Sequence, residues 1–234
     1  METQEVTMKP IIMNEQNNPK TTANILAWYK FNSDFKDYSG HGYNITVSDI
    51  ETSFVEGHNG IYCLRLKNYD DRPPYNHLSV PFTISIGNFS ICLWIKDALK
   101  YVSPNIPSLT IYSGIDSTSG LDLYLVSNEY SMSTKYDEGS STFSNTHKIS
   151  ITDSIWNHIC FTFDYSNNII KYYKDGNFIN SKTLGSTEWN PSTYASNIYI
   201  LNGSYYYYYN VMDYRVYEGI LTQDEIYSVY KYIG

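Results

Sequence analysis

Basic residues are scarce in this 234-residue sequence. Only 16 Lys and Arg stand against 24 Asp and Glu, so the formal net charge is −8. Because binding to the nucleic-acid backbone requires clustered Lys and Arg, this balance argues against a nucleic-acid-binding protein. No apolar run approaches the roughly 20 residues that span a bilayer, and no basic segment followed by a hydrophobic core marks a secretory signal. We therefore expect no membrane insertion.

Alanine and arginine are rare, whereas strand-forming residues are abundant. There are 26 Tyr, 25 Ile and 22 Asn, but only 4 Ala and 3 Arg. The abundant residues have AT-rich codons, which indicates an AT-rich genome such as that of a large DNA virus, a phage, a protist or a low-GC bacterium. Because β-formers dominate over helix formers, an all-β fold is expected.

Cysteine is also scarce, with three residues at Cys63, Cys92 and Cys160. They are odd in number, far apart and placed in apolar runs, and no Cys/His spacing indicates zinc. We expect buried, inert thiols and a reducing site of assembly.

The chain divides into a polar arm and a series of short strands. Residues 1–23 contain Pro10 and Pro19 and show no periodicity, so we expect an N-terminal arm followed by one domain at 24–234. Turn signals about every 8–12 residues are typical of a sandwich or barrel. The run 89–96 is apolar on both faces, which predicts a strand covered on both sides. An Asp-Gly pair at 175–176 predicts a tight hairpin within a meander at 158–183.

One short C-terminal helix is expected after the last strand. Thr222 and Glu225 have the spacing of a capping box, and the apolar residues that follow repeat at helical spacing: Ile226, Val229, Tyr230 and Ile233. We expect this helix to lie against the sandwich.

Four segments resemble laminin-G-like, concanavalin A-like jelly rolls. AWYKFNSDFKDYSGHGYN (27–44) is similar to the first strand and turn of that family, and FSICLWIK (89–96) to its central strand. The segments 155–179 and 211–230 are similar to its W-x-H meander and its closing strand and helix. The resemblance implies a two-sheet antiparallel jelly-roll β-sandwich. It does not define the function, because proteins with this fold range from lectins to virion proteins. The stretch 97–150 matches no motif.

The same resemblance implies a structural calcium ion that ties the first turn to the last strand. Carried over residue by residue, its ligands are Asp37, Ser39, Asn44 and Asp213. These are the hard oxygen ligands that Ca²⁺ prefers. His41 departs from the family pattern, because a hard cation does not favour imidazole. The alternative is that Asp37 and Ser39 only cap the turn through local hydrogen bonds.

A second predicted site is a glycan-binding surface around a run of five tyrosines. Alternate rings beside amide side chains would form a platform for sugars or for another protein. Its expected residues are Tyr205, Tyr207, Tyr209, Trp189 and Asn202. The alternative is a tract that arises from codon bias and lies on a strand or an interface edge.

No catalytic arrangement is recognisable. Jelly-roll hydrolases of the laminarinase type carry alternating carboxylates on one strand, and the sequence has no such run. His158 is expected to be a hydrogen-bonded strand residue rather than a base.

We therefore expect a non-enzymatic module that binds a glycan or glycoprotein and is displayed on a larger particle such as a virion. The alternative is a structural virion component that contacts other virion proteins through residues 1–23. The expected location is the particle surface if the source is viral, and otherwise the cytoplasm.

Overall fold

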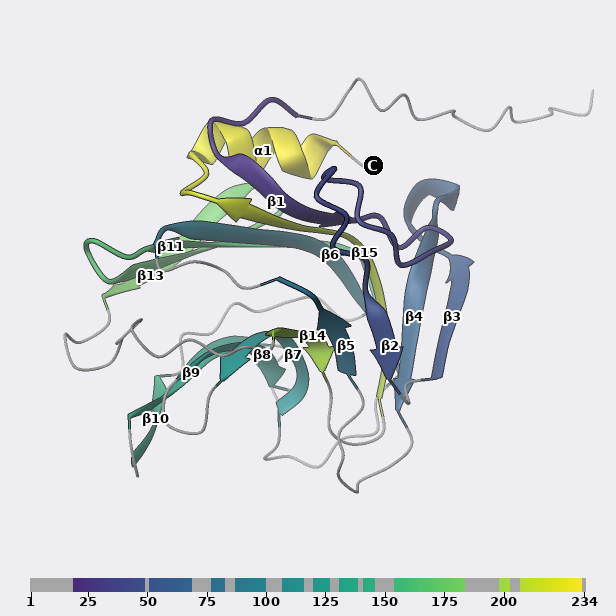
Figure 1. The fold of residues 1–234 in the computed structure, drawn as a ribbon, viewed down its shortest axis with the longest axis horizontal. Helices are drawn as coiled ribbons and strands as arrows, with labels where there is room; N and C mark the ends of the chain where they lie inside the picture. The colour runs from purple at the N-terminus through teal and green to yellow at the C-terminus, as the bar shows by residue number, and fades with distance from the viewer. Residues whose placement is uncertain are drawn as a thin grey trace, which may run out of the picture.

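Two antiparallel sheets lie face to face in the computed structural model (Figure 1). The structure describes residues 19–48, 51–68, 77–82, 87–99, 107–115, 120–126, 131–138, 141–145, 154–183, 198–202 and 207–232. The sandwich expected from turn spacing and from the resemblance is therefore confirmed.

The larger sheet has eight strands within these ranges. In spatial order they are β13 (Asn177–Thr183), β12 (Ile169–Lys174), β11 (Asn157–Asp164), β6 (Phe89–Leu99), β15 (Tyr207–Glu218), β4 (Tyr62–Asn68) and β3 (Glu51–Glu56), and β1 (Asn24–Tyr29) also pairs with β15. Strands far apart in sequence are thus neighbours, since β6 lies between β11 and β15.

The smaller sheet has seven described strands. In spatial order they are β10 (Ser141–Asn145), β9 (Ser131–Glu138), β8 (Gly120–Val126), β7 (Pro107–Ile115), β14 (Ile198–Asn202), β5 (His77–Val80) and β2 (Thr46–Ser48). The stretch 97–150, which matches no motif, supplies four of these strands, from β7 to β10.

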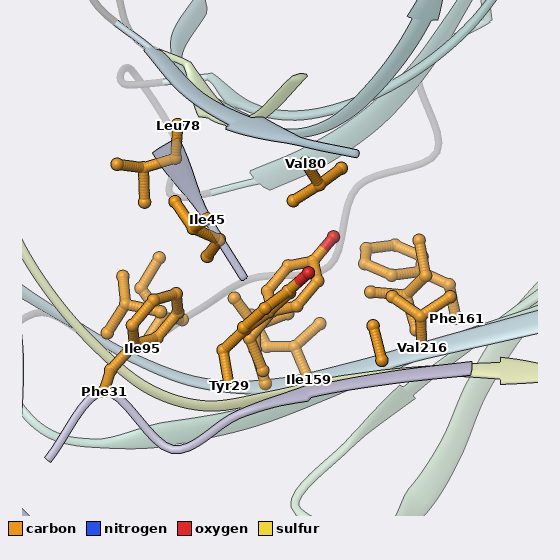
Figure 2. Close-up of a cluster of buried hydrophobic side chains, with 14 of the residues drawn as sticks. Tyr29, Phe31, Ile45, Leu78, Val80, Ile95, Ile159, Phe161 and Val216 are labelled. Carbon is orange, nitrogen blue, oxygen red and sulfur yellow. The ribbon is translucent and has the colours of Figure 1, made fainter. Parts of the chain in front are cut away.

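The main hydrophobic core fills the space between the two sheets (Figure 2). Leu78 and Val80 of β5 point from the smaller sheet toward Tyr29, Ile159 and Val216 of the larger one. Each of these side chains is at most 4% exposed. Burial of apolar surface is worth roughly 25 cal/mol per Å², so this layer is the chief source of stability.

Strand β6 is buried on both faces, as its sequence predicts. Its residues Ile91 and Leu93 face the main core, whereas Cys92 and Trp94 face the opposite side of the sheet. Cys92 lies directly across from Cys160 of β11, and the two form a disulfide. The expectation of three free thiols is therefore wrong for this pair, because antiparallel pairing brings two distant cysteines into register.

Cys63 is the free cysteine of the described residues. It is fully buried, and burial raises the pKa of its thiol to about 11.

The C-terminal helix α1 (Gln223–Lys231) covers the outer face of the larger sheet (Figure 1). Its capping box is present as predicted: Glu225 N–H donates to Thr222 Oγ1, and Thr222 N–H donates to the Glu225 carboxylate. Ile226 and Val229 pack on the Cys92–Cys160 pair in a second hydrophobic cluster. Ile233, the next residue at this spacing, lies outside the described ranges.

The hairpin between β12 and β13 turns at Asp175 and Gly176, as the Asp-Gly pair predicts. Both residues have left-handed backbone, with φ of 50° and 76°. This is the conformation that a two-residue hairpin of the type I′ class requires.

The predicted arm is described only from Pro19 onward, so the boundary at residue 24 stays a prediction. Strand β1 begins at Asn24. Just before it, Thr22 N–H donates to the Glu225 carboxylate and Ala23 packs in the cluster beneath α1. The segment that leads into β1 therefore lies along the helix.

Candidate functional site on the helix-covered face

The predicted calcium turn is organised around the carboxylate of Asp37. Its Oδ1 accepts hydrogen bonds from the backbone N–H groups of Trp28 (3.0 Å) and Ser39 (2.8 Å). Its Oδ2 accepts from Ser39 Oγ (2.8 Å) and from Tyr43 N–H (3.0 Å). Burial alone would raise the pKa of Asp37, but these hydrogen bonds hold it below its ordinary value. Both carboxylate oxygens are thus engaged by donors of the protein itself.

Asn44 is used within the same turn. Its Oδ1 accepts a hydrogen bond from Asp37 N–H at 2.9 Å. Gly40 and Gly42 adopt left-handed backbone, with φ of 99° and 78°, which lets the turn close around Asp37.

Asp213 lies in a buried ion pair on β15. Its backbone is left-handed (φ 54°) at an irregularity in the pairing of β15 with β6. Asp213 Oδ1 accepts from Arg215 Nε at 2.9 Å and from the indole N–H of Trp28 at 2.7 Å. Burial alone would lower the pKa of Arg215, but Asp213 and Tyr217 raise it, so the guanidinium is charged.

The connection expected from a calcium ion is made by Trp28. Its backbone N–H binds Asp37 and its indole N–H binds Asp213, which joins the first turn to the last strand. A calcium ion needs six to eight oxygen ligands. The arrangement fits such a shell poorly, because four donors surround Asp37 and a guanidinium contacts Asp213. The described residues contain no cluster of three or more His, Cys, Asp or Glu side chains that could hold a metal.

These contacts support the capped-turn alternative for Asp37 and Ser39. Calcium binding stays a prediction of the family resemblance.

The predicted tyrosine surface is only partly covered by the structure. Tyr205 and Trp189 lie outside the described ranges. Asn202 ends β14 in the smaller sheet and Tyr207 begins β15 in the larger one. Tyr209 is 6% exposed and packs in the main core. The prediction that the Tyr209 ring is exposed on a binding surface is therefore wrong. Tyr209 pairs with Leu66 of β4, and both side chains lie on the interior face of the sheet.

A row of aromatic rings that the sequence analysis did not single out crosses the outer face of the larger sheet. The ring centroids of His58 and Trp156 are 6.1 Å apart and those of His58 and Trp94 are 4.9 Å apart. Trp94 stacks on Tyr230 of α1 at 5.5 Å, and Tyr230 contacts Tyr227 at 6.0 Å. Trp94 is buried, whereas Tyr227 is 46% exposed. The row thus leads from the sheet to the outer surface of the helix.

His158 lies beside this row but is not available as a base. Burial, with a further contribution from the charge of Arg215, lowers the pKa of His158 to about 3. Its ring contacts Trp94 at 5.3 Å and Tyr230 at 5.7 Å, and its backbone N–H donates to Asp175 Oδ1 at 3.0 Å. The residue lies in β11, as the sequence predicts, but its buried ring Nδ1 has no hydrogen-bond partner among the described residues, so the hydrogen bond expected for this side chain is absent at that atom.

An open hollow lies at the exposed end of the row. Its volume is about 400 Å³, and it is lined by Pro19, Tyr227, Ser228, Lys231 and Tyr232. The helical spacing of Tyr227 and Lys231 could have indicated a shared face. Nothing in the sequence indicated that Pro19 lies beside them.

Two of the lining side chains are held by contacts behind them. Tyr232 lies 4.9 Å from the guanidinium of Arg215 and 6.3 Å from the ring of Trp28. Lys231 Nζ lies 5.2 Å from the ring centroid of Tyr227 and 5.0 Å from that of Tyr230. The buried network at Asp213 therefore supports one wall of the hollow.

Comparison with protein families identifies the fold. A family model described as the concanavalin A-like lectin/glucanases superfamily matches residues 73–227. The chain belongs to this superfamily. No curated protein sequence matches it.

Solved structures similar to this superfamily member include binding domains of botulinum neurotoxins. The binding domain of neurotoxin DC, in complex with rat synaptotagmin II, is 15% identical with a TM-score of 0.71, and the match covers 90% of this chain and 52% of that one. The receptor binding domain of type G is 20% identical with a TM-score of 0.65, covering 89% and 51%. A structure of neurotoxin type C is 14% identical with a TM-score of 0.70, and the match covers 90% of this chain and 51% of that one. Its description states that cell entry of this toxin depends on interaction with two ganglioside molecules.

This chain spans about half the length of those neurotoxin domains, and identities this low show the fold alone. No helix in the described part of the chain is long and apolar enough to cross a membrane.

Proposed function

We propose that the domain is a non-catalytic module that binds a glycan or a glycoprotein. The observation that carries this proposal is the hollow on α1, where Tyr227 and Tyr232 lie beside the hydroxyl of Ser228 and the ammonium of Lys231. Sugar rings have an apolar face that stacks on aromatic rings and hydroxyls that need polar partners, and tyrosine supplies both kinds of contact.

Membership of a superfamily that includes lectins supports the proposal. Among the neurotoxin domains with the same fold, that of DC is in complex with synaptotagmin II, and cell entry by type C depends on interaction with two ganglioside molecules. This chain is similar to about half of their length.

The non-catalytic part of the proposal is supported by the structural contacts of three ionisable groups. Asp213 pairs with Arg215, Glu225 completes the capping box, and His158 is buried and neutral. Each of these groups has a structural task, so none of them is placed to act as an acid or a base.

A glycan array followed by titration calorimetry tests the proposal. Tyr227→Ala removes an exposed ring of the hollow and should reduce affinity at least tenfold. Tyr62→Ala is the matched control, because that ring is 54% exposed and does not line the hollow. An array without any hit would overturn the proposed function.

The tyrosine tract is the second location for the same function. Tyr205→Ala and Tyr207→Ala, with Trp189 and Asn202 as their predicted neighbours, should leave affinity unchanged if the hollow binds the ligand. A loss in these variants with full binding in Tyr227→Ala would move the site to the tract.

The alternative function is that of a particle component held through residues 1–23. The contact of Thr22 with Glu225 supports a fixed exit of this segment beside α1. Deleting residues 1–22, which end before β1, should then abolish incorporation into particles and leave the domain folded. Incorporation of the truncated protein would contradict this alternative.

A further inference from the structure

The hollow combines aromatic rings with one cation. We infer that it selects an acidic saccharide, whose carboxylate or sulfate pairs with Lys231 while its sugar ring packs on Tyr227 and Tyr232. The inference rests on the proposed function and specifies its ligand.

No described carboxylate neutralises the charge of Lys231. The ion pairs Asp34–Lys36 and Asp213–Arg215 lie elsewhere, and Lys231 makes no ion pair with any described residue. Its Nζ is instead placed over the rings of Tyr227 and Tyr230, within the distance of about 6 Å that is typical of cation–π contacts. The ammonium of Lys231 lines the hollow and favours an anionic ligand there, against the general repulsion of anions by a chain with a net charge of −8.

The helix end does not cancel this preference. The C-terminal end of an α-helix carries about half a negative charge, whereas the ammonium carries a full positive charge. In addition, Tyr232 N–H donates to the carbonyls of Ser228 and Val229, so two of the terminal carbonyls are already engaged. Of these two contributions the ammonium is the larger, so together they favour an anion beside Lys231.

The walls of the hollow are held in place before a ligand binds. Tyr232 rests on Arg215 and Trp28, and Tyr227 rests on Tyr230, which stacks on the buried Trp94. A binding site with ordered side chains loses less conformational entropy when it is filled.

Ser228 supplies the matching hydroxyl. Its Oγ donates to the carbonyl of Asp224 at 2.8 Å, which leaves the oxygen free to accept a hydrogen bond from a sugar hydroxyl.

Calorimetry of the full chain with three matched oligosaccharides tests the inference. All three contain lactose: sialyllactose adds a sialic acid residue with its carboxylate, and sulfated lactose adds only a sulfate ester. We expect at least one of the two acidic sugars to bind at least tenfold more tightly than lactose at low salt. The preference for acidic over neutral sugar should decrease in 0.5 M salt, where the Debye length is about 4 Å, because a partly exposed ion pair is screened.

Variants of Lys231 identify the partner of the anion. Lys231→Gln should reduce the acidic-to-neutral preference at least fivefold, whereas Lys231→Arg should retain most of it. Lys171→Gln on the exposed side of β12 is the control and should leave the preference unchanged. A melting curve of each variant shows that the helix is intact.

The possible results separate the inference from the function beneath it. Equal binding of lactose and the acidic sugars, or an unchanged preference in Lys231→Gln, would overturn the inference and leave glycan binding standing. Absence of binding to any glycan would overturn the proposed function. A preference for only one acidic sugar would support the inference and identify the anion as a carboxylate or a sulfate.

Discussion

Asp213→Asn should strongly destabilise the domain, because it removes the charge that neutralises a buried guanidinium. The side chains of Arg215 and Asp213 are 0% and 1% exposed. The asparagine oxygen can still accept the indole N–H of Trp28, so the substitution tests the charge rather than the shape. Removal of one partner of a buried ion pair costs about 3–5 kcal/mol, since the other charge is left uncompensated.

That loss corresponds to a large change in melting temperature. For a domain of this size, 1 kcal/mol shifts the midpoint by about 2–4 °C, so the expected decrease is roughly 6–20 °C. Arg215→Met should have a similar effect because it leaves the carboxylate buried. The double variant should lose at least about 1 kcal/mol less than the sum of the two single variants, because it buries no charge.

The assay is thermal melting with and without calcium, with EDTA in the metal-free arm. If the ion pair accounts for Asp213, the loss in Asp213→Asn is the same in both arms. A saturated calcium site would instead stabilise the wild-type protein by about 2.7 kcal/mol at 100 times its dissociation constant. That stabilisation would be absent from both Asp37→Asn and Asp213→Asn.

Lys36→Gln is the control for charge removal in general. Its amine lies 3.8 Å from Asp34 with the lysine side chain 72% exposed, so the expected loss is below about 1 kcal/mol. A loss of less than 1 kcal/mol in Asp213→Asn, or additive effects in the double variant, would refute the ion-pair argument. Stabilisation by calcium that depends on Asp213 would restore the metal site predicted from the family.

Three further predictions concern the helix and the sheet beneath it. The pKa of His158 is about 3 in the folded state and near 6.5 in the unfolded state. The unfolding free energy should therefore fall as the pH drops from about 6.5 to about 3, by up to about 1.4 kcal/mol per pH unit. Denaturant titrations of His158→Gln should lack this contribution. Glu225→Ala should lower the unfolding free energy by about 1 kcal/mol at pH 7 and by less at pH 3, because hydrogen bonds outweigh burial and hold the pKa of Glu225 below its ordinary value. In denaturant titrations, Gly176→Ala should lower the unfolding free energy by about 1–3 kcal/mol more than Gly60→Ala. Both glycines have φ of 76°, so the backbone strain is the same in the two variants. Only at position 176 would the added Cβ meet the rings of Tyr227 and Tyr230 on α1, at 2.9 and 3.0 Å.

Local signals predicted those parts of the fold that depend on a few adjacent residues. The Asp175–Gly176 turn and the Thr222–Glu225 capping box each require one backbone conformation, and the sequence contains the residues that favour it. The alternation in β6 predicted burial on both faces for the same reason, because side chains of a strand point alternately to opposite sides.

Features that depend on register could not be predicted in this way. Cys92 and Cys160 are 68 residues apart, and only the pairing of β6 with β11 brings them together. The burial of Tyr209 likewise follows from its pairing with Leu66 on β4. A shift of one residue in either pair would turn the side chains to the other face of the sheet.

The hollow on α1 lies between these two cases. Helical spacing places Tyr227 and Lys231 one turn apart, away from the buried Ile226 and Val229, so the sequence contains that half of the site. The other half comes from Tyr232, which is held by a guanidinium on β15, and from Pro19, which approaches because Thr22 binds Glu225 at the start of the helix. A surface assembled in this way should weaken when either support is removed. Loss of Arg215 should therefore reduce ligand affinity as well as stability, even though its side chain is completely buried.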